Sequence, residues 1–420
     1  MRKIRNLRWW IIGMIFLASV LNYIDRQALS ILAPTVQKEL GLTNQDYAFV
    51  VNLFLVAYTI SYIVSGRVVD KLGVRLSLAL FIGWWSVANM LTAFSRSLGS
   101  LGAFRFMLGL GEAGNWTAAP KAVSEWFPAR ERGLAIGIYT LGATIGATLA
   151  PVLILALATW HSWQAAFVVT GAAGLLWLIP WFWLYRRPAE HPRITAEELA
   201  HIASDSSAEK TADTADWGGW RALFVRRELW LLVLGRMLTD PVWYFFQFWF
   251  AKYLYEGRGL DQKSLSVTWV VFLAADIGAL SGGWFSGRLI KRNIAPALSR
   301  LRVMLACAAL VPLAALIPLS GSLWLVLALG MVAILAHMAW LINLSALVTD
   351  LVPRRSLATV FGLVAAGSTV GGILMNQAVG QLVSGHSYDL AFYLMVGVHP
   401  LAWMILWFGG VLRPSASAVP

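Results

Sequence analysis

Long apolar runs dominate this sequence and restrict what it can fold into. Twelve runs of mostly apolar residues recur along the 420-residue chain, and a helix of about 20 residues is long enough to cross the hydrocarbon core of a bilayer. Lipid offers backbone N–H and C=O groups no partners, and the runs lack the alternating pattern of barrel strands. Each run is therefore predicted to be a membrane-spanning α-helix. The predicted spans are residues 9–33, 47–67, 76–95, 98–121, 133–157, 164–185, 228–252, 265–287, 301–319, 322–347, 357–383 and 389–411.

The composition agrees with a chain that faces lipid. Hydrophobic residues make up 59% and charged residues only 13%, against about 25% charged residues in soluble domains. The single cysteine, Cys307, excludes an internal disulfide framework and a cysteine-rich metal site, and no metal or organic cofactor is expected. The basic N-terminus followed by an apolar run resembles a signal peptide. The run is too long and continues through Asp25 and Arg26 without a convincing cleavage site, so we expect a retained first helix.

The distribution of Lys and Arg predicts the orientation of the chain. With both termini in the cytoplasm, 25 of the 33 basic residues fall in cytoplasmic segments and 5 in outer segments, while Arg26, Arg105 and Arg236 lie inside spans. This asymmetry follows the positive-inside rule. It accounts for the net charge of +12 without a nucleic-acid partner, and we expect a multi-pass protein of the cell inner membrane.

The chain is predicted to consist of two halves. The long polar stretch at 186–227 separates six spans from six, and its composition favours a cytoplasmic linker with a short helix near 196–202. The predicted domains are a six-helix bundle at 1–185, the linker, and a six-helix bundle at 228–420. A weak repeat supports two pseudo-symmetric bundles, because small residues recur at an offset of 225 residues and let helix backbones approach closely. The repeat pairs Pro128, Gly137, Gly142 and Gly146 with Pro353, Gly362, Gly367 and Gly371.

The segment between the second and third spans carries a specific motif. Its defining residues are Gly66, Asp70, Lys71, Gly73 and Arg75. This spacing resembles the loop signature G-x-x-x-D-[RK]-x-G-x-[RK] of the major facilitator superfamily, and the resemblance implies the major facilitator fold. A turn that presents an acid and bases to neighbouring helix ends can hold one gate state and release another. The alternative is an ordinary basic cytoplasmic turn.

Four ionisable residues lie inside the first and fourth predicted spans, where charges are costly and usually functional. Asp25 and Arg26 are neighbours in the first span, and Arg105 precedes Glu112 by seven residues in the fourth. Seven residues are nearly two helical turns, so Arg105 and Glu112 share one stripe about 10 Å apart. Arg26 and Arg105 fall at similar depth and suit a carboxylate, while the two acids suit protons. Packing pairs, Asp25 with Arg26 or Arg105 with Glu112, are the alternative.

Other polar residues in the spans admit plainer explanations. Arg236 and Asp240 are spaced i,i+4, which favours a packing pair. Asp276 and His337 either line a cavity or satisfy a neighbouring backbone group. Asp350 lies near the cytoplasmic end of its span and is expected to act at a gate or as a helix cap.

Several stretches resemble the hexuronate transporters of the anion:cation symporter branch of the major facilitator superfamily. They are NYIDRQAL at 22–29, FRFMLGLGEAGN at 104–115, KAVSEWFPARER at 121–132, SWQAAF at 162–167, LTDPVWYFFQFW at 238–249, FLAADIG at 272–278 and HMAWLINLSALVTDLVP at 337–353. The resemblance implies proton-coupled import of glucuronate, galacturonate or a related acid. It assigns proton coupling to Asp25 and Glu112, and substrate contacts to Arg26, Arg105 and Tyr58. Trp243, Tyr244, Trp340 and Asn343 are further candidates, with aromatic faces for sugars and an amide for hydroxyls, or else packing residues.

Departures from that family bear on the substrate. Thr140, Ala143 and Thr144 stand where members of the family carry Asn and other polar residues. Ala366 aligns with an Asn of galactonate carriers, and Trp116-Thr117 and Leu341 also differ from the usual residues. Each change loses or moves a hydroxyl contact, so a smaller or less hydroxylated acid remains open.

The sequence therefore predicts a monomeric secondary transporter that rocks its two halves around a small organic anion and protons. A carrier of simple carboxylates and an exporter of amphipathic anions are the alternatives within transport. A membrane sensor would need an output module, and 186–227 is too short and polar to supply one. An enzyme is not expected, because the sequence has no HExxH motif, nucleophile elbow or phosphate loop.

Overall fold

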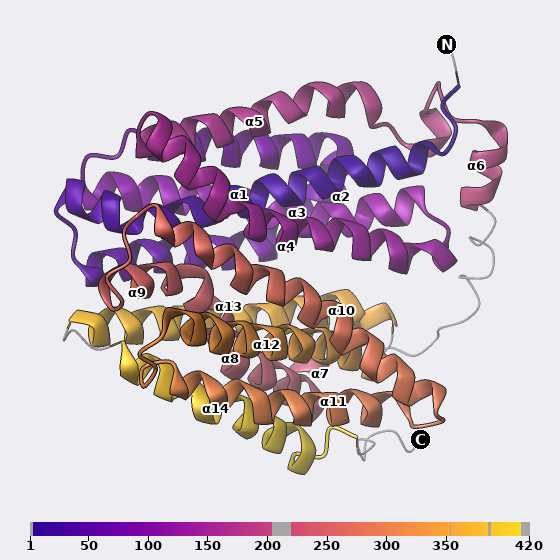
Figure 1. The fold of residues 1–420 in the computed structure, drawn as a ribbon. Helices are drawn as coiled ribbons and strands as arrows, with labels where there is room; N and C mark the ends of the chain where they lie inside the picture. Colours follow the sequence, from indigo (N-terminus) through magenta and orange to yellow (C-terminus); the bar gives the residue numbers. More distant parts are fainter. Residues whose placement is uncertain (1–2, 204–219, 353, 385–387, 413–420) are drawn as a thin grey trace. The chain divides into compact units, whose positions relative to one another are not determined.

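The computed structural model describes residues 3–203, 220–352, 354–384 and 388–412, apart from the side chains at 63, 67, 70, 129, 130, 132, 133, 203, 220, 221 and 354–359. Across these residues the chain is helical, which confirms the predicted all-α class (Figure 1). The first part contains α1 (Leu7–Leu40), α2 (Asn44–Thr92), α3 (Leu98–Trp126), α4 (Ala129–Trp160), α5 (Trp163–Leu184), η1 (Pro188–Glu190) and α6 (Ala196–Ala203). The second part contains α7 (Trp220–Phe224), α8 (Arg227–Phe248), α9 (Phe250–Glu256), η2 (Ser264–Thr268), α10 (Trp269–Lys291), α11 (Pro296–Leu310), η3 (Val311–Leu316), α12 (Leu323–Leu351), α13 (Arg354–Ser384) and α14 (Asp389–Phe408).

The long helices correspond to the twelve predicted spans. The helix α2 contains two of these segments, which meet at Gly73. Three other segments each consist of two consecutive helices, α8–α9, η2–α10 and α11–η3. Counted in this way, the described residues contain twelve long segments. Nine helices of the described part are long and apolar enough to cross a membrane. The other long segments are the first part of α2, α3 and α8. Charged residues lower the apolar character of the last two, Arg105 and Glu112 in α3 and Arg236 and Asp240 in α8.

Large apolar side chains on the outside of these helices agree with lipid as the surrounding solvent. On α5, for example, Leu176, Ile179 and Trp183 are 64%, 68% and 61% exposed. An exposed apolar stripe of this kind is costly in water and favourable in hydrocarbon. The chain is a multi-pass membrane protein.

The chain divides into two compact units. The first comprises residues 1–42 and 49–213, and the second comprises 43–48 and 214–420. The division after residue 213 falls inside the predicted linker at 186–227.

Glycines of α4 and α13 allow close helix packing within each unit. A Cβ on Gly146 would lie 2.5 Å from the Val20 carbonyl oxygen of α1, and a Cβ on Gly371 would collide with the Met237 carbonyl oxygen of α8. Gly142 and Gly367 face the same two partner helices one turn earlier. The predicted close approach is therefore confirmed at two of the three repeated glycine pairs, and it joins equivalent helices in the two units. Pro353, the partner of Pro128 in the repeat, lies outside the described residues.

The short helix α6 is confirmed at its predicted position and is tied to the start of α1. Glu198 accepts hydrogen bonds from the backbone N–H groups of Leu7 and Arg8, at 2.9 and 3.1 Å, and so satisfies donors that a helix N-terminus leaves open. The Arg8 guanidinium bridges Glu198 and Glu131 at 3.0 Å each. Burial by itself would raise the pKa of the Glu131 carboxyl. Hydrogen bonds from His201 and Arg8 outweigh this effect, so the pKa is lowered from its usual value. The beginning of the predicted linker is thus part of the first unit.

The glycine contacts lead to a stability prediction. We expect Gly146→Ala and Gly371→Ala each to lower the thermal unfolding midpoint in detergent, because the added methyl group meets a backbone carbonyl and overpacking costs about 1–3 kcal/mol. Gly137→Ala and Gly362→Ala are the matched controls on the same helices, since a Cβ there meets no described atom within 4 Å. The controls should be neutral or stabilising, because alanine favours helix over glycine. Equal losses in all four variants would contradict the close packing.

Candidate functional site

Arg26 of α1 lies at the centre of a buried polar cluster in the first unit. Its side chain is 8% exposed, and its Nε donates to Glu112 Oε2 of α3 at 2.8 Å. Its Nη2 donates to the Tyr58 hydroxyl of α2 at 2.8 Å and to Asn22 Oδ1 at 3.2 Å. The Tyr23 and Tyr58 rings lie 4.6 and 4.7 Å from the guanidinium carbon. The cluster thus combines an ion pair with aromatic faces that favour a cation.

Arg105 of α3 lies next to this cluster. Its Nη2 donates to the backbone carbonyl oxygen of Arg26 at 3.1 Å, and its Nη1 is 3.5 Å from that of Asp25. The guanidinium carbons of Arg26 and Arg105 lie 5.6 and 5.4 Å from the same Phe54 ring. The structure therefore brings both guanidinium groups to one ring.

The ion-pair partner of Glu112 differs from the one expected if Arg105 and Glu112 formed a packing pair. Glu112 pairs with Arg26 across α1 and α3, rather than with Arg105 on its own helix. Asn22 reinforces the contact, because its Nδ2 donates to the Glu112 carbonyl oxygen at 3.2 Å. The pairing partner of Glu112 depends on which faces of α1 and α3 meet, and sequence spacing along one helix does not contain that information.

Asp25 lies in different surroundings from its neighbour Arg26, as the helical angle of about 100° between adjacent residues requires. Asn89 of α2 donates to Asp25 Oδ1 at 2.7 Å and to Thr170 Oγ1 of α5 at 2.8 Å. Asp25, Asn89 and Thr170 are all buried. Neither Asn89 nor Thr170 is among the residues predicted from the sequence, although polar side chains in the middle of apolar spans are a usable signal.

In the second unit, the aromatic candidates surround a buried pair of histidines. His337 Nδ1 of α12 and His399 Nε2 of α14 are 3.2 Å apart. Trp243 of α8 stacks on His337 with ring centroids 6.4 Å apart, and Trp340 meets His399 edge-on at 5.2 Å. His337 was considered from the sequence as a lone polar residue. His399 was missed, because only the fold places it against His337.

The remaining candidates of the second unit make contacts within its helices. Asn343 donates to the carbonyl oxygens of Gly282 and Ala339 at 3.0 and 2.8 Å, so its amide joins α12 to α10. The Tyr244 hydroxyl lies 3.4 Å from Ser368 Oγ of α13. Tyr244 is partly exposed, as Trp243 is, whereas Asn343 is buried.

Two further charged candidates of the second unit, Asp240 and Asp350, form ion pairs. Arg236 donates to Asp240 at 2.7 Å on α8, so the contact that the i,i+4 spacing predicts is formed. Asp350 of α12 pairs with Arg300 of α11 at 3.3 Å.

The segment predicted to form the gate turn is helical except at one residue, Gly73. The sequence led us to expect a loop from Gly66 to Arg75, but α2 is helical through this region except at Gly73, where φ is 72° and ψ is 164°. Such a φ favours glycine because a side chain would be strained there. The expected loop was therefore wrong in extent, because one glycine supplies the change of direction.

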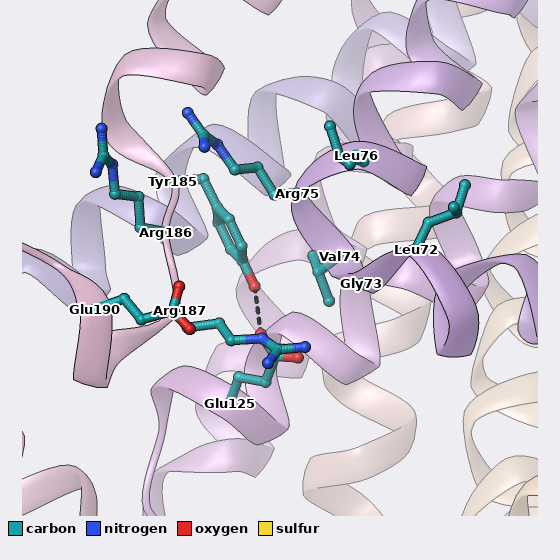
Figure 2. A pocket seen from close by; sticks show the side chains of 10 residues that line it. All are labelled: Leu72, Gly73, Val74, Arg75, Leu76, Glu125, Tyr185, Arg186, Arg187 and Glu190. Carbon is teal, nitrogen blue, oxygen red and sulfur yellow. Dashed lines mark hydrogen bonds between the residues drawn. The ribbon is translucent and has the colours of Figure 1, made fainter.

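A pocket of about 330 Å³ adjoins this turn, lined by Gly73, Arg75, Glu125, Tyr185 and Arg187 among other residues. Figure 2 shows the Tyr185 hydroxyl donating to Glu125, at 2.8 Å. Arg75 donates to the Phe182 carbonyl oxygen at 2.7 Å, and Arg187 Nη2 lies 3.7 Å from where a Cβ of Gly73 would stand. Among the other gate candidates Lys71 is exposed, and the Asp70 side chain lies outside the described residues. The described part of the turn thus contacts the end of α5 and the segment that follows it.

The family comparison agrees with this architecture. The model of the Major Facilitator Superfamily matches residues 15–341, so the chain belongs to that superfamily. It is a membrane transporter rather than an enzyme. A solved structure of a bacterial homologue of the human lysosomal transporter Spinster, in an inward-facing and occupied conformation, resembles it with a TM-score of 0.77 over 97% of both chains. At 19% identity that likeness supports the fold alone.

Two curated relatives are transporters of sugar acids. The hexuronate transporter of Escherichia coli K12 is 31% identical over 416 residues, which covers 97% of this chain and 95% of that protein. The galacturonate transporter of Dickeya chrysanthemi is 36% identical over 286 residues, which covers 68% of this chain and 83% of that protein. These relatives support the family resemblance that the sequence motifs indicated.

The buried ion pair leads to a prediction about stability. We expect Arg26→Met and Glu112→Leu each to lower the free energy of unfolding by about 3–5 kcal/mol, because each leaves an uncompensated buried charge. The double variant should lose less than the sum of the two single losses. Unfolding in denaturant, followed by circular dichroism, measures all four members of the cycle.

The ion pair of Arg236 and Asp240 is the matched control for this cycle, since the Arg236 side chain is 21% exposed and the pair lies within one helix. A smaller coupling energy is expected there. Strictly additive losses at Arg26 and Glu112 would contradict the ion pair.

Proposed function

We propose that this transporter imports a sugar acid, a hexuronate or related aldonate or aldarate, together with protons by alternating access. One observation carries the proposal, the placement of the Arg26 and Arg105 guanidinium groups against the same buried Phe54 ring. Two adjacent guanidinium groups shielded from water favour a carboxylate, since each donates in a two-pronged geometry. The sugar-acid relatives support the same class of substrate.

Competition for Arg26 couples the proton to the anion in this proposal. The Arg26 Nε that would hold a substrate carboxylate already donates to Glu112. A proton on Glu112 neutralises that carboxylate and weakens its hold on the guanidinium, so the substrate can replace it without leaving two anions on one cation. Binding of the anion and protonation of Glu112 then favour each other, which is the thermodynamic requirement for symport.

Arg105, Tyr58 and Asp25 have distinct parts in the proposal. Arg105 supplies the second cation, because its guanidinium lies against the same Phe54 ring as that of Arg26 and is held there by α1 carbonyl oxygens. Tyr58, which already binds Arg26, hydrogen-bonds the substrate near its carboxylate. Asp25 is a second proton site, and its link to Asn89 would transmit a change in its charge to α2 and α5.

The second unit contributes aromatic surfaces in this proposal. Trp243 and Tyr244 are partly exposed and present rings suited to the apolar face of a sugar. Trp340 and Asn343 are buried against neighbouring helices, so we propose that they support the site rather than touch the substrate.

The proposal also covers a cytoplasmic gate and the orientation of the protein in the membrane. Gly66, Asp70, Lys71, Gly73 and Arg75 form a gate on the cytoplasmic side that closes and opens as the halves rock. We propose that the protein works as a monomer in the inner membrane, with both termini in the cytoplasm, because the basic residues are concentrated in the same set of segments.

A less hydroxylated organic anion is the second candidate substrate. Thr144 of α4 and Thr369 of α13 donate to carbonyl oxygens of their own helices, at 3.0 and 2.9 Å. Hydroxyl groups engaged in this way can accept from sugar hydroxyls but no longer donate to them, and the side chains of Ala143 and Ala366 offer neither. A small carboxylate would need only the guanidinium groups.

Uptake into proteoliposomes tests the main proposal. We expect labelled glucuronate or galacturonate to accumulate when the outside is acidic, and Arg105→Lys to reduce the initial rate by about 10-fold or more because lysine lacks the planar fork. Arg96→Lys is the matched control, since Arg96 is exposed at a helix end. Unlabelled simple carboxylates added as competitors distinguish the second candidate. Equal uptake by Arg105→Lys and wild type would refute the assignment of Arg105, and uptake indifferent to the pH gradient would refute symport.

A further inference from the structure

A groove on the surface of the second unit is lined by none of the residues proposed to bind the substrate or protons. It has a volume of about 590 Å³ and is formed by α10, α11 and α12. That volume falls within the roughly 300–1,000 Å³ typical of ligand sites. Three of its lining residues are arginines, and most of the others are apolar.

The arginines gather at one end of the groove. Arg288 and Arg292 lie at the end of α10, and Arg302 lies in the second turn of α11. All three are exposed. None of them pairs with a carboxylate in the part of the chain that the structure describes. Nearby Arg300 differs, because its side chain binds Asp350 and Ser286. The three arginines therefore present uncompensated positive charge.

The rest of the groove is apolar. Leu310 follows Arg302 by eight residues on α11, which places it about 12 Å farther along the helix axis. Ala306 lines the wall between them, and Trp284 and Phe285 are 56% and 54% exposed at the opposite wall. The Arg288 guanidinium lies 5.2 Å from the Trp284 ring. Positive charge at one end of an apolar channel matches an amphiphile with an anionic head.

We propose that this groove binds an anionic phospholipid, with its phosphate held by Arg288, Arg292 and Arg302 and an acyl chain lying along Ala306 and Leu310. The groove opens on a surface that faces lipid, so a phospholipid is the anionic amphiphile present there at high concentration. Basic pockets between membrane helices recognise lipid headgroups through the same chemistry. Trp284 marks the boundary between headgroup and hydrocarbon, where tryptophan is favoured.

Thermal unfolding of the whole, delipidated transporter in a neutral detergent tests the proposal. Phosphatidylglycerol should raise the unfolding midpoint, whereas phosphatidylcholine with the same acyl chains, and glycerol phosphate without chains, should not. Replacing all three arginines by glutamine should weaken the response to phosphatidylglycerol on the order of 100-fold, given the worth of each basic residue near anionic lipid. Lys291→Gln is the matched control, because Lys291 is exposed beside the arginines but does not line the groove.

A second measurement keeps the test informative if the triple variant fails to fold. Cys307 is the only cysteine, so Cys307→Ser with Ala306→Cys places one thiol in the groove wall. Phosphatidylglycerol should slow its labelling by a maleimide, and phosphatidylcholine should not. The proposal is overturned if labelling is equally fast in both lipids, if the triple variant responds as wild type does, if Lys291→Gln loses the response equally, or if glycerol phosphate alone suffices.

Discussion

The ion pair between Arg26 and Glu112 joins α1 to α3 in the buried interior of the first unit, and the proposed transport site is built around it. A charge in such surroundings is tolerated only when it is paired and hydrogen-bonded. Asn22 and Tyr58 supply the further hydrogen bonds, and aromatic rings cover the guanidinium faces. The same requirement gives the pair its proposed use, because any event that neutralises Glu112 leaves Arg26 in need of another anion.

The two units share a packing scheme but differ in their charges. Gly146 and Gly371 bring equivalent helices into backbone contact, so the scaffold repeats. The first unit buries Asp25, Arg26, Arg105 and Glu112, whereas the second buries a histidine pair, with Trp243 stacked on His337 and Trp340 edge-on to His399. Anion and proton chemistry is therefore proposed for the first unit, and aromatic contact with the substrate for the second.

Features that depend on spacing along one helix were predictable from the sequence. The spans, the glycine contacts, the pair at Arg236 and the short helix α6 all follow from local patterns. Features that depend on which helix faces meet were not. Glu112 and Asp25 each bind a residue far away in the chain, and so does His337, which contacts His399. The two residues of each contact are 62 to 86 positions apart. The extent of the turn at Gly73 was missed because one left-handed residue replaced a loop.

Exchange by the Glu112→Gln variant tests the coupling most directly. In proteoliposomes with labelled hexuronate outside and unlabelled hexuronate inside, exchange requires the site to change sides loaded but needs no net proton movement. We predict that Glu112→Gln retains this exchange and loses accumulation driven by a pH gradient, because glutamine mimics a carboxyl that is always protonated. Gradient-driven accumulation equal to that of wild type would contradict the assignment of Glu112 as the group that couples proton to anion.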